Sequence, residues 1–213
     1  MGEYKYIQTY TRYGNAENFQ QILRNFRHLL LQTGLSQVEI DSRLSGITWS
    51  VDDFRSDSAE SIPLIHNMLL DLGHSKLNVC ASIIIWMDKI GSYYLNEPWI
   101  ELLIMVKPED QSYTKDAYQL EKVLFKIMSL ICETFQETGV YVTNKMQDGE
   151  AFIGLLGNGE EKLWAFDCAI IPLPYSPLYG NVPQDFSSYT VPHGIGYVRK
   201  YQERREFMSP KSV

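Results

Sequence analysis

The chain has 213 residues, of which 45% are hydrophobic and 21% charged, and its formal net charge is −7 at pH 7. This composition predicts a folded, soluble protein and excludes extensive disorder. The negative charge argues against nucleic acid or an anionic membrane as partner, because both attract positive fields. No apolar run approaches the ~20 residues that cross a bilayer. The sequence alone names no reaction and no ligand.

The cysteines indicate the kind of cellular compartment in which the protein resides. Cys80, Cys132 and Cys168 lie far apart inside apolar runs, which predicts buried, reduced thiols. Reduced thiols indicate a reducing compartment, and the N-terminal segment has no apolar signal core. We therefore expect a cytoplasmic protein.

The first third of the chain predicts a strand, a helix, a strand and a second helix. Alternating tyrosines favour a strand over residues 3–13, and Asn15 is a suitable N-cap for a helix that ends at Thr33. Helical spacing of apolar residues predicts the second helix over 62–72, with a proline in its first turn. The apolar positions are Phe19, Ile22, Leu23, Phe26, Leu29 and Leu30 in the first helix, Ile47, Trp49 and Val51 in the second strand, and Ile62, Ile65, Leu69 and Leu72 in the second helix.

The stretch from 78 to 106 predicts the centre of a sheet. Two runs rich in Ile, Val and Trp flank a segment of Gly, Ser, Asn and Pro, a composition typical of paired strands. A long helix is predicted over 114–137 from a broad apolar stripe of the kind that lies across a sheet. Three short apolar runs between 140 and 171, separated by Asp-Gly and Gly-Asn-Gly turns, predict an antiparallel meander.

Residues 172–192 contain five of the nine prolines, a density that predicts no regular element. We therefore divide the chain into a single α+β domain over 1–171 and an irregular extension rich in Pro and Tyr over 172–213, packed on the domain or on a partner subunit. The predicted domain has a mostly antiparallel sheet of about five or six strands, covered by one long and one or two shorter helices.

Two carboxylates interrupt apolar strands: Glu101 in WIELLIMV and Asp167 in WAFDCAII. A buried carboxylate requires a partner, a metal or a solvated face. With Ser92 in a Gly-Ser pair upstream, this order resembles polymerase-β-type nucleotidyltransferases. The resemblance implies that Ser92, Glu101 and Asp167 hold divalent ions and a nucleotide. The chain departs from that pattern at Trp99, where the family has its first carboxylate. The alternative is that both carboxylates are structural and face solvent or pair with a base.

Other catalytic and metal-binding patterns are missing from the sequence. The four histidines and three cysteines have no metal-ligand spacing, and there is no nucleophile elbow, Walker loop or dinucleotide fingerprint. We therefore expect no metal and no cofactor, and the sequence favours a non-enzymatic protein.

The C-terminal extension is the strongest candidate for an interaction segment. Disordered segments are normally poor in aromatic residues, so its aromatic side chains are expected to be buried against the domain or a neighbouring subunit. A Pro-x-x-Pro motif at 174–177 and a basic tail after 199 leave polyproline and phosphate recognition open as alternatives. The leading hypothesis is a binding or accessory protein that contacts another protein, basic in charge, or a second copy of itself. The candidate interaction residues are Tyr175, Tyr179, Phe186, Tyr189 and Tyr201.

Overall fold

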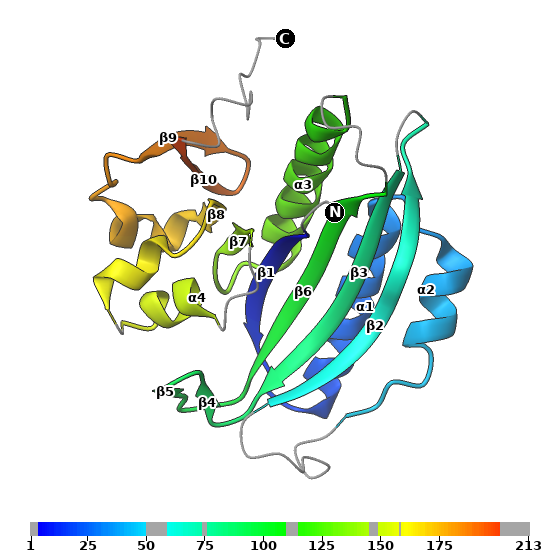
Figure 1. Ribbon diagram of the computed structural model, residues 1–213. Helices are drawn as coiled ribbons and strands as arrows, with labels where there is room; N and C mark the ends of the chain where they lie inside the picture. The colour runs from blue at the N-terminus through cyan, green and yellow to red at the C-terminus, as the bar shows by residue number, and fades with distance from the viewer. Residues whose placement is uncertain are drawn as a thin grey trace.

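The computed structural model describes residues 4–49, 59–73, 76–109, 115–144, 149–157 and 159–200. Within them, eight strands form one sheet in the order β2-β3-β6-β1-β7-β8-β10-β9, every neighbouring pair being antiparallel (Figure 1). The strands are β1 (Lys5–Arg12), β2 (Ala59–Asp71), β3 (Lys76–Trp86), β6 (Trp99–Pro108), β7 (Val140–Thr143), β8 (Cys168–Pro172), β9 (Phe186–Val191) and β10 (Gly194–Arg199), and a separate hairpin consists of β4 (Lys89–Ile90) and β5 (Tyr93–Tyr94).

Helices lie on both faces of this sheet. They are α1 (Ala16–Gln32), α2 (Gln37–Leu44), α3 (Lys115–Thr134), α4 (Glu150–Leu155) and the 3-10 helices η2 (Glu160–Trp164) and η3 (Leu173–Tyr179). None of the helices described is long and apolar enough to span a membrane.

The expected fold is wrong in the size of the sheet and in its cover. The sheet has eight strands instead of five or six, and a second two-stranded sheet accompanies it. The sheet has more strands than expected because residues 59–71 form β2 and the C-terminal extension contributes β9 and β10. One long helix does not cover it: α1 and α3 share one face, while α4, η2 and η3 pack on the other.

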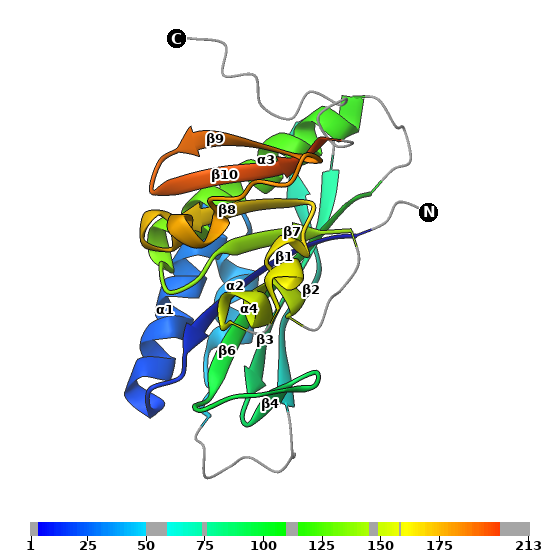
Figure 2. The same ribbon diagram turned by 90° about the vertical axis from the view of Figure 1, so that its left-hand side faces the viewer.

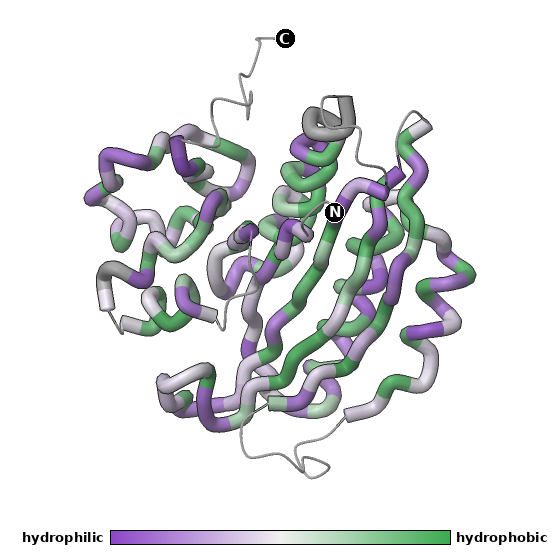
Figure 3. The backbone as a smooth tube through the Cα atoms, viewed as in Figure 1, coloured by the Kyte–Doolittle hydropathy of each residue, from purple (hydrophilic) through white to green (hydrophobic). Residues whose placement is uncertain are grey.

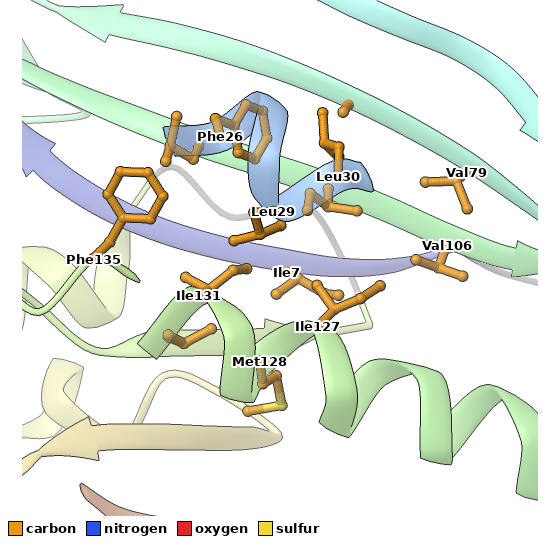
Figure 4. Close-up of a cluster of buried hydrophobic side chains, with 14 of the residues drawn as sticks. Ile7, Phe26, Leu29, Leu30, Val79, Val106, Ile127, Met128, Ile131 and Phe135 are labelled. Atoms are coloured by element: carbon orange, nitrogen blue, oxygen red, sulfur yellow. The ribbon is translucent and has the colours of Figure 1, made fainter. Parts of the chain in front are cut away.

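The larger core lies between α1, α3 and the sheet. Ile7 of β1 is fully buried at its centre, in contact with side chains from both helices. Figure 4 shows Leu29 of α1 and Ile131 of α3 converging on Ile7. The hydrophobic stretches that line this core run along β3 and β6 (Figure 3), whose side chains account for much of the buried apolar surface.

The second core lies on the opposite face and is mainly aromatic. Phe152 of α4 stacks on Tyr10 of β1 with ring centroids 4.2 Å apart, and meets Trp99 of β6 edge-on at 4.8 Å. Figure 2 shows α4 beside β1 and β7. Since Tyr10 and Ile7 belong to one strand but to different cores, β1 separates the two layers of side chains.

Four sequence predictions are confirmed, the first being the strand over residues 3–13, which forms β1. α1 begins behind the N-cap Asn15, whose Oδ1 accepts the backbone N–H of Asn18 at 2.9 Å. The long helix forms as α3. The runs around 78–106 form β3 and β6, which pair with each other.

The predicted helix over 62–72 is wrong, because all of these residues except the last belong to β2. The pairing of β2 with β3 shifts at Pro63/Ile65 and again between Ile65 and Met68, and Asn67 has a positive φ of 52°. Each shift inserts unpaired residues, so buried positions no longer alternate strictly along the strand. The apolar spacing that resembled a helix is the result of these irregularities.

The predicted strand at 47–51 and the predicted three-stranded meander are also wrong. Ile47 and Trp49 lie in a segment without regular structure, where Trp49 packs edge-on against Tyr13 at 4.8 Å, and Val51 lies outside the described residues. The middle run of the meander forms the helix α4. A short apolar run does not distinguish a strand from a buried helix.

The expectation of no regular element over residues 172–192 is wrong as well, because η3 and β9 form there. β9 and β10 form a hairpin that extends the sheet beyond β8, with β9 as its last strand. The prolines do not prevent this because none lies inside β9 or β10. Pro192 stands in their turn, followed by His193 at a φ of 67°. Pro174 and Pro177 lie in η3 and not in a polyproline II segment.

Candidate functional site

A hollow of about 520 Å³ opens between α4, η2 and η3. We call it the Trp164 hollow. It is lined by Gly154, Leu155, Gly157, Gly159, Leu163, Trp164, Leu178 and Asn181.

Glycines shape this hollow. Gly157 and Gly159 have φ angles of 91° and 97°, a left-handed conformation that lets the chain turn from α4 into η2. Gly154 lies where α4 approaches η2 so closely that an added Cβ would be 2.5 Å from the backbone nitrogen of Leu163. Without side chains at these positions, the hollow stays open toward Trp164.

Trp164 is the centre of an aromatic cluster. Its ring meets Tyr179 edge-on at 5.3 Å, Tyr197 edge-on at 5.2 Å and Phe186 at 4.9 Å. These three neighbours are buried, whereas Trp164 itself is half-buried and presents part of its surface to the hollow. The rigid aromatic neighbours therefore hold the Trp164 ring in place as one wall of the site.

Arg199 fixes the backbone that carries this ring. Its Nη2 donates hydrogen bonds to the carbonyl oxygens of Trp164 at 2.9 Å and of Phe166 at 3.0 Å. The guanidinium also lies 4.8 Å from the ring centroid of Phe186, and its Nε is 3.9 Å from Oδ2 of Asp185. The last residue of β10 thus ties η2 to the edge of the sheet. This is a structural role for the first residue of the basic tail.

Exposed aliphatic side chains accompany the hollow. Leu178 lines it with 53% of its surface exposed, and Leu173 in the same 3-10 helix is 58% exposed. Val182, four residues beyond Leu178, is 39% exposed. Among the described residues, the lining side chains carry no charge. They can receive an apolar group of a ligand and offer no cation to a phosphate.

A much smaller cavity lies beside the second core. Its volume is about 10 Å³, room for a single water molecule. Its walls include Gln8, Tyr10, Tyr141, Thr143 and Glu150. It is too small to hold a substrate.

The structure does not bring Ser92, Glu101 and Asp167 together. Ser92 is exposed in the turn between β4 and β5. Glu101 lies in β6, and Asp167 directly precedes β8, with β1 and β7 between those strands. Three steps of ~4.8 Å place the two carboxylate-bearing backbones roughly 14 Å apart before any offset along the strands. A two-metal site requires ions only ~4 Å apart.

Each of the two carboxylates has local hydrogen bonds. Glu101 is 1% exposed and accepts bonds from Gln8 Nε2 at 2.6 Å and Trp86 Nε1 at 2.8 Å. Asp167 accepts the backbone N–H of Asn144 at 2.9 Å. Within the described segments, no three His, Cys, Asp or Glu side chains gather into a group that could hold a metal ion.

The candidate interaction residues of the extension fall into three groups. Tyr179 and Phe186 are buried against the chain's own second core, and Tyr175 is packed on it while partly exposed. Tyr189 packs partly on the larger core. Tyr201 lies outside the described residues.

Burial changes the acidity of several side chains near the sheet. It raises the pKa of Tyr141 and of Cys168 to about 12 each, and that of Cys132 to about 11. The pKa values of Tyr179 and Tyr197 are raised for the same reason. These groups therefore stay protonated and neutral near pH 7, and none is an activated nucleophile.

Sequence reasoning missed the hollow. The sequence predicts a strand at 151–156 and no regular element over 172–192, so Gly154, Gly157, Leu178 and Asn181 are not among the predicted site residues. The available signal was the group of three glycines beside Trp164, together with leucines in a proline-rich segment. Glycines clustered next to an aromatic residue often mark a close backbone approach.

Comparison with known proteins gives no relative: no protein-family model matches the chain, and neither do curated proteins or solved structures. The geometry of the site therefore has to carry the functional argument.

Proposed function

We propose that this is a non-enzymatic binding protein that engages another protein through the Trp164 hollow. The observation that carries the proposal is an open hollow whose described lining residues are uncharged, whose wall is a half-buried tryptophan and whose margin is an exposed leucine, Leu178. Protein interfaces concentrate their binding energy where one large apolar side chain enters a pocket of this kind.

The fit favours a short apolar anchor on the partner. Trp164 offers a rigid flat surface, and Leu155 and Leu178 offer aliphatic surface around it. A leucine, methionine or aromatic side chain would bury apolar area on both. Leu173 and Val182 extend the exposed apolar area beyond the hollow.

The overall charge favours a basic partner. At −7, the chain attracts cationic surfaces at long range, which speeds encounter more than it tightens the complex. The expected ligand is therefore a protein segment with one apolar anchor flanked by lysine or arginine.

A displayed library of random peptides tests the proposal. Peptides selected on the whole protein are measured by fluorescence polarisation against the parent, Leu178→Asp and Val38→Asp. Val38 is a matched control because it is an aliphatic residue, 79% exposed, on α2 and outside the hollow. The expected result is a shared apolar anchor with basic flanks, at least about tenfold weaker binding to Leu178→Asp, and unchanged binding to Val38→Asp.

Two results would contradict the proposal. The first is that repeated selection enriches no peptide above background. The second is that the enriched peptides bind Leu178→Asp and the parent equally. Circular dichroism of Leu178→Asp checks that any loss of binding is not a loss of fold.

A further inference from the structure

The two edges of the large sheet differ in their chemistry. β2 forms one edge, and its pairing is interrupted by two register shifts, a proline at 63 and a left-handed Asn67. Features of this kind prevent a sheet edge from pairing with another strand. β9 forms the other edge with the sequence FSSYTV, which has no proline, no charge and no shift in its pairing with β10.

The hydrogen bonds at the end of the hairpin show which backbone groups of β9 point outward. Lys200 N donates to Asp185 O at 2.7 Å. Hydrogen-bonded and non-hydrogen-bonded pairs alternate in an antiparallel ladder, so Ser187, Tyr189 and Val191 bond to β10. Ser188 and Thr190 then direct their N–H and C=O groups away from it.

These outward groups lie at an accessible edge. The side chains of Ser188 and Thr190 are both exposed, and β9 is the last strand in the order of the sheet. No other strand of the described segments pairs with this edge. The N–H of Phe186 already donates to the carbonyl of Pro183 at 3.0 Å. The part of β9 that is left to pair with another strand is therefore centred near Tyr189.

We propose that β9 pairs in antiparallel fashion with β9 of a second copy of the chain, with the two-fold axis at Tyr189. In this register Ser188 exchanges backbone hydrogen bonds with Thr190 of the partner subunit, and Thr190 with the partner's Ser188. The two sheets become one continuous sheet across the interface. An antiparallel pairing of identical strands satisfies two-fold symmetry and closes as a dimer.

Side chains select the second copy and this register. Tyr189 and the partner's Tyr189 form a non-hydrogen-bonded backbone pair at the axis. Each Tyr189 ring lies over Gly196 of its own β10, where an added Cβ would be 2.2 Å from the ring, so the ring points away from the edge and leaves the two strands room to approach. At each end, Asp185 lies level with His193 of the partner subunit. Both side chains are exposed, and the Asp185 carboxylate can accept a hydrogen bond from the imidazole N–H. Shifting the strands by two residues removes this pair.

This inference goes beyond the proposed function, since it concerns a different surface. It also changes the role first expected of the extension. Tyr179, Phe186 and Tyr197 are buried in their own chain, so in this dimer the extension packs on its home domain and not on the partner subunit. It completes the home sheet and thereby creates the edge that pairs.

Light scattering on the full-length protein, across a concentration series, is the first test. The parent is expected to reach twice the 24.6 kDa of one chain, and Ser188→Pro to stay at one chain because proline removes an outward N–H. Ser188→Ala keeps that N–H and is expected to dimerise as the parent does. A parent of single-chain mass throughout, or a dimer unaffected by Ser188→Pro, overturns the proposal.

Crosslinking gives a second test that does not depend on the proline variant folding. Tyr189→Cys places two thiols opposite each other at the axis, within the range of a disulfide. In Thr190→Cys each thiol lies opposite the partner's Ser188, so the two thiols are further apart. The native Cys80, Cys132 and Cys168 are buried in the parent, and because Tyr189 lies beside Cys168, Tyr189→Ala measures the background from the native thiols. Under mild oxidation Tyr189→Cys should form covalent dimers at least about tenfold faster than Thr190→Cys. Equal rates would contradict the pairing.

Discussion

The indole Nε1 of Trp86 donates a 2.8 Å hydrogen bond to Oε2 of Glu101, a side chain that is 1% exposed. Gln8 Nε2 donates to the other carboxylate oxygen at 2.6 Å. The residue that sequence reasoning proposed as a metal ligand thus links three neighbouring strands, β1, β6 and β3, by accepting bonds on both oxygens.

Replacing this carboxylate by an amide is expected to destabilise the fold. Glu101→Gln has one acceptor oxygen, and its NH₂ group must face one of the two donors. We expect a loss of about 1–3 kcal/mol in the free energy of unfolding, measured with urea. Glu97→Gln is the control: Glu97 pairs with Arg12 at 2.7 Å, but both side chains are more than half exposed, so the loss should stay below about 1 kcal/mol. Equal losses would assign Glu101 no special structural role.

The stripe of α3 is expected to be a major source of stability. Ile127 is 1% exposed and lies in the core beside Ile7 of β1 (Figure 4). Ile127→Ala should cost about 2–5 kcal/mol, as should Leu124→Ala, because each leaves a cavity in a packed interior. Lys126→Ala, on the exposed side of the same helix, should change stability little. Losses below about 1 kcal/mol at both core positions would contradict this packing.

The approach of α4 to η2 predicts a sharp difference between two glycines. Gly154→Ala would place a Cβ 2.5 Å from the nitrogen of Leu163, which is backbone and cannot rotate away. Gly180 has a φ of −63°, and a Cβ there would meet only the carbonyl oxygen of Pro177 at 3.4 Å. Thermal melting should show Gly154→Ala clearly destabilised and Gly180→Ala close to the parent. Similar melting temperatures for both variants would mean that α4 can move away from η2 without loss of stability, which contradicts this prediction.

Buried phenol and thiol groups predict alkaline sensitivity. Tyr141 and Cys168 have native pKa values of about 12, against ordinary values of 10.0 and 9.0. Between these values the unfolded chain has released protons that the native chain still holds, so stability falls as pH rises from about 9 to 12, and these two groups leave it unchanged below that range. Urea unfolding at several pH values measures the slope. Tyr141→Phe should reduce the slope above pH 10, and an unchanged slope would contradict the burial argument.

The parts of the fold that the sequence predicted are those governed by local signals. Asn15 caps α1 as expected, and α3 follows its broad apolar stripe. β2 was mistaken for a helix because its bulges at 63–68 disturb the alternation on which a strand prediction depends. The element at 150–155 was too short to be assigned by periodicity.

The candidate site was harder to predict than the fold. The Trp164 hollow exists because Leu155, Trp164 and Leu178, from three separate elements, meet in space. No local sequence pattern predicts that these three side chains lie together. Glu101 did stand out in the sequence, correctly, as a carboxylate in need of partners, but the partners Gln8 and Trp86 come from other strands.

The place of β1 in the sheet bears on how the chain folds as it is synthesised. Ile7 pairs with Ile104 on one side and Val142 on the other, so the earliest strand made is the one whose neighbours come much later. Pairing strands that are far apart in the sequence slows folding, because chain entropy is lost before the new contacts stabilise the fold. During translation, β1 cannot complete its pairing until β7 has emerged, more than a hundred residues later. A nascent chain of this protein is therefore expected to depend on chaperone protection until β7 has left the ribosome.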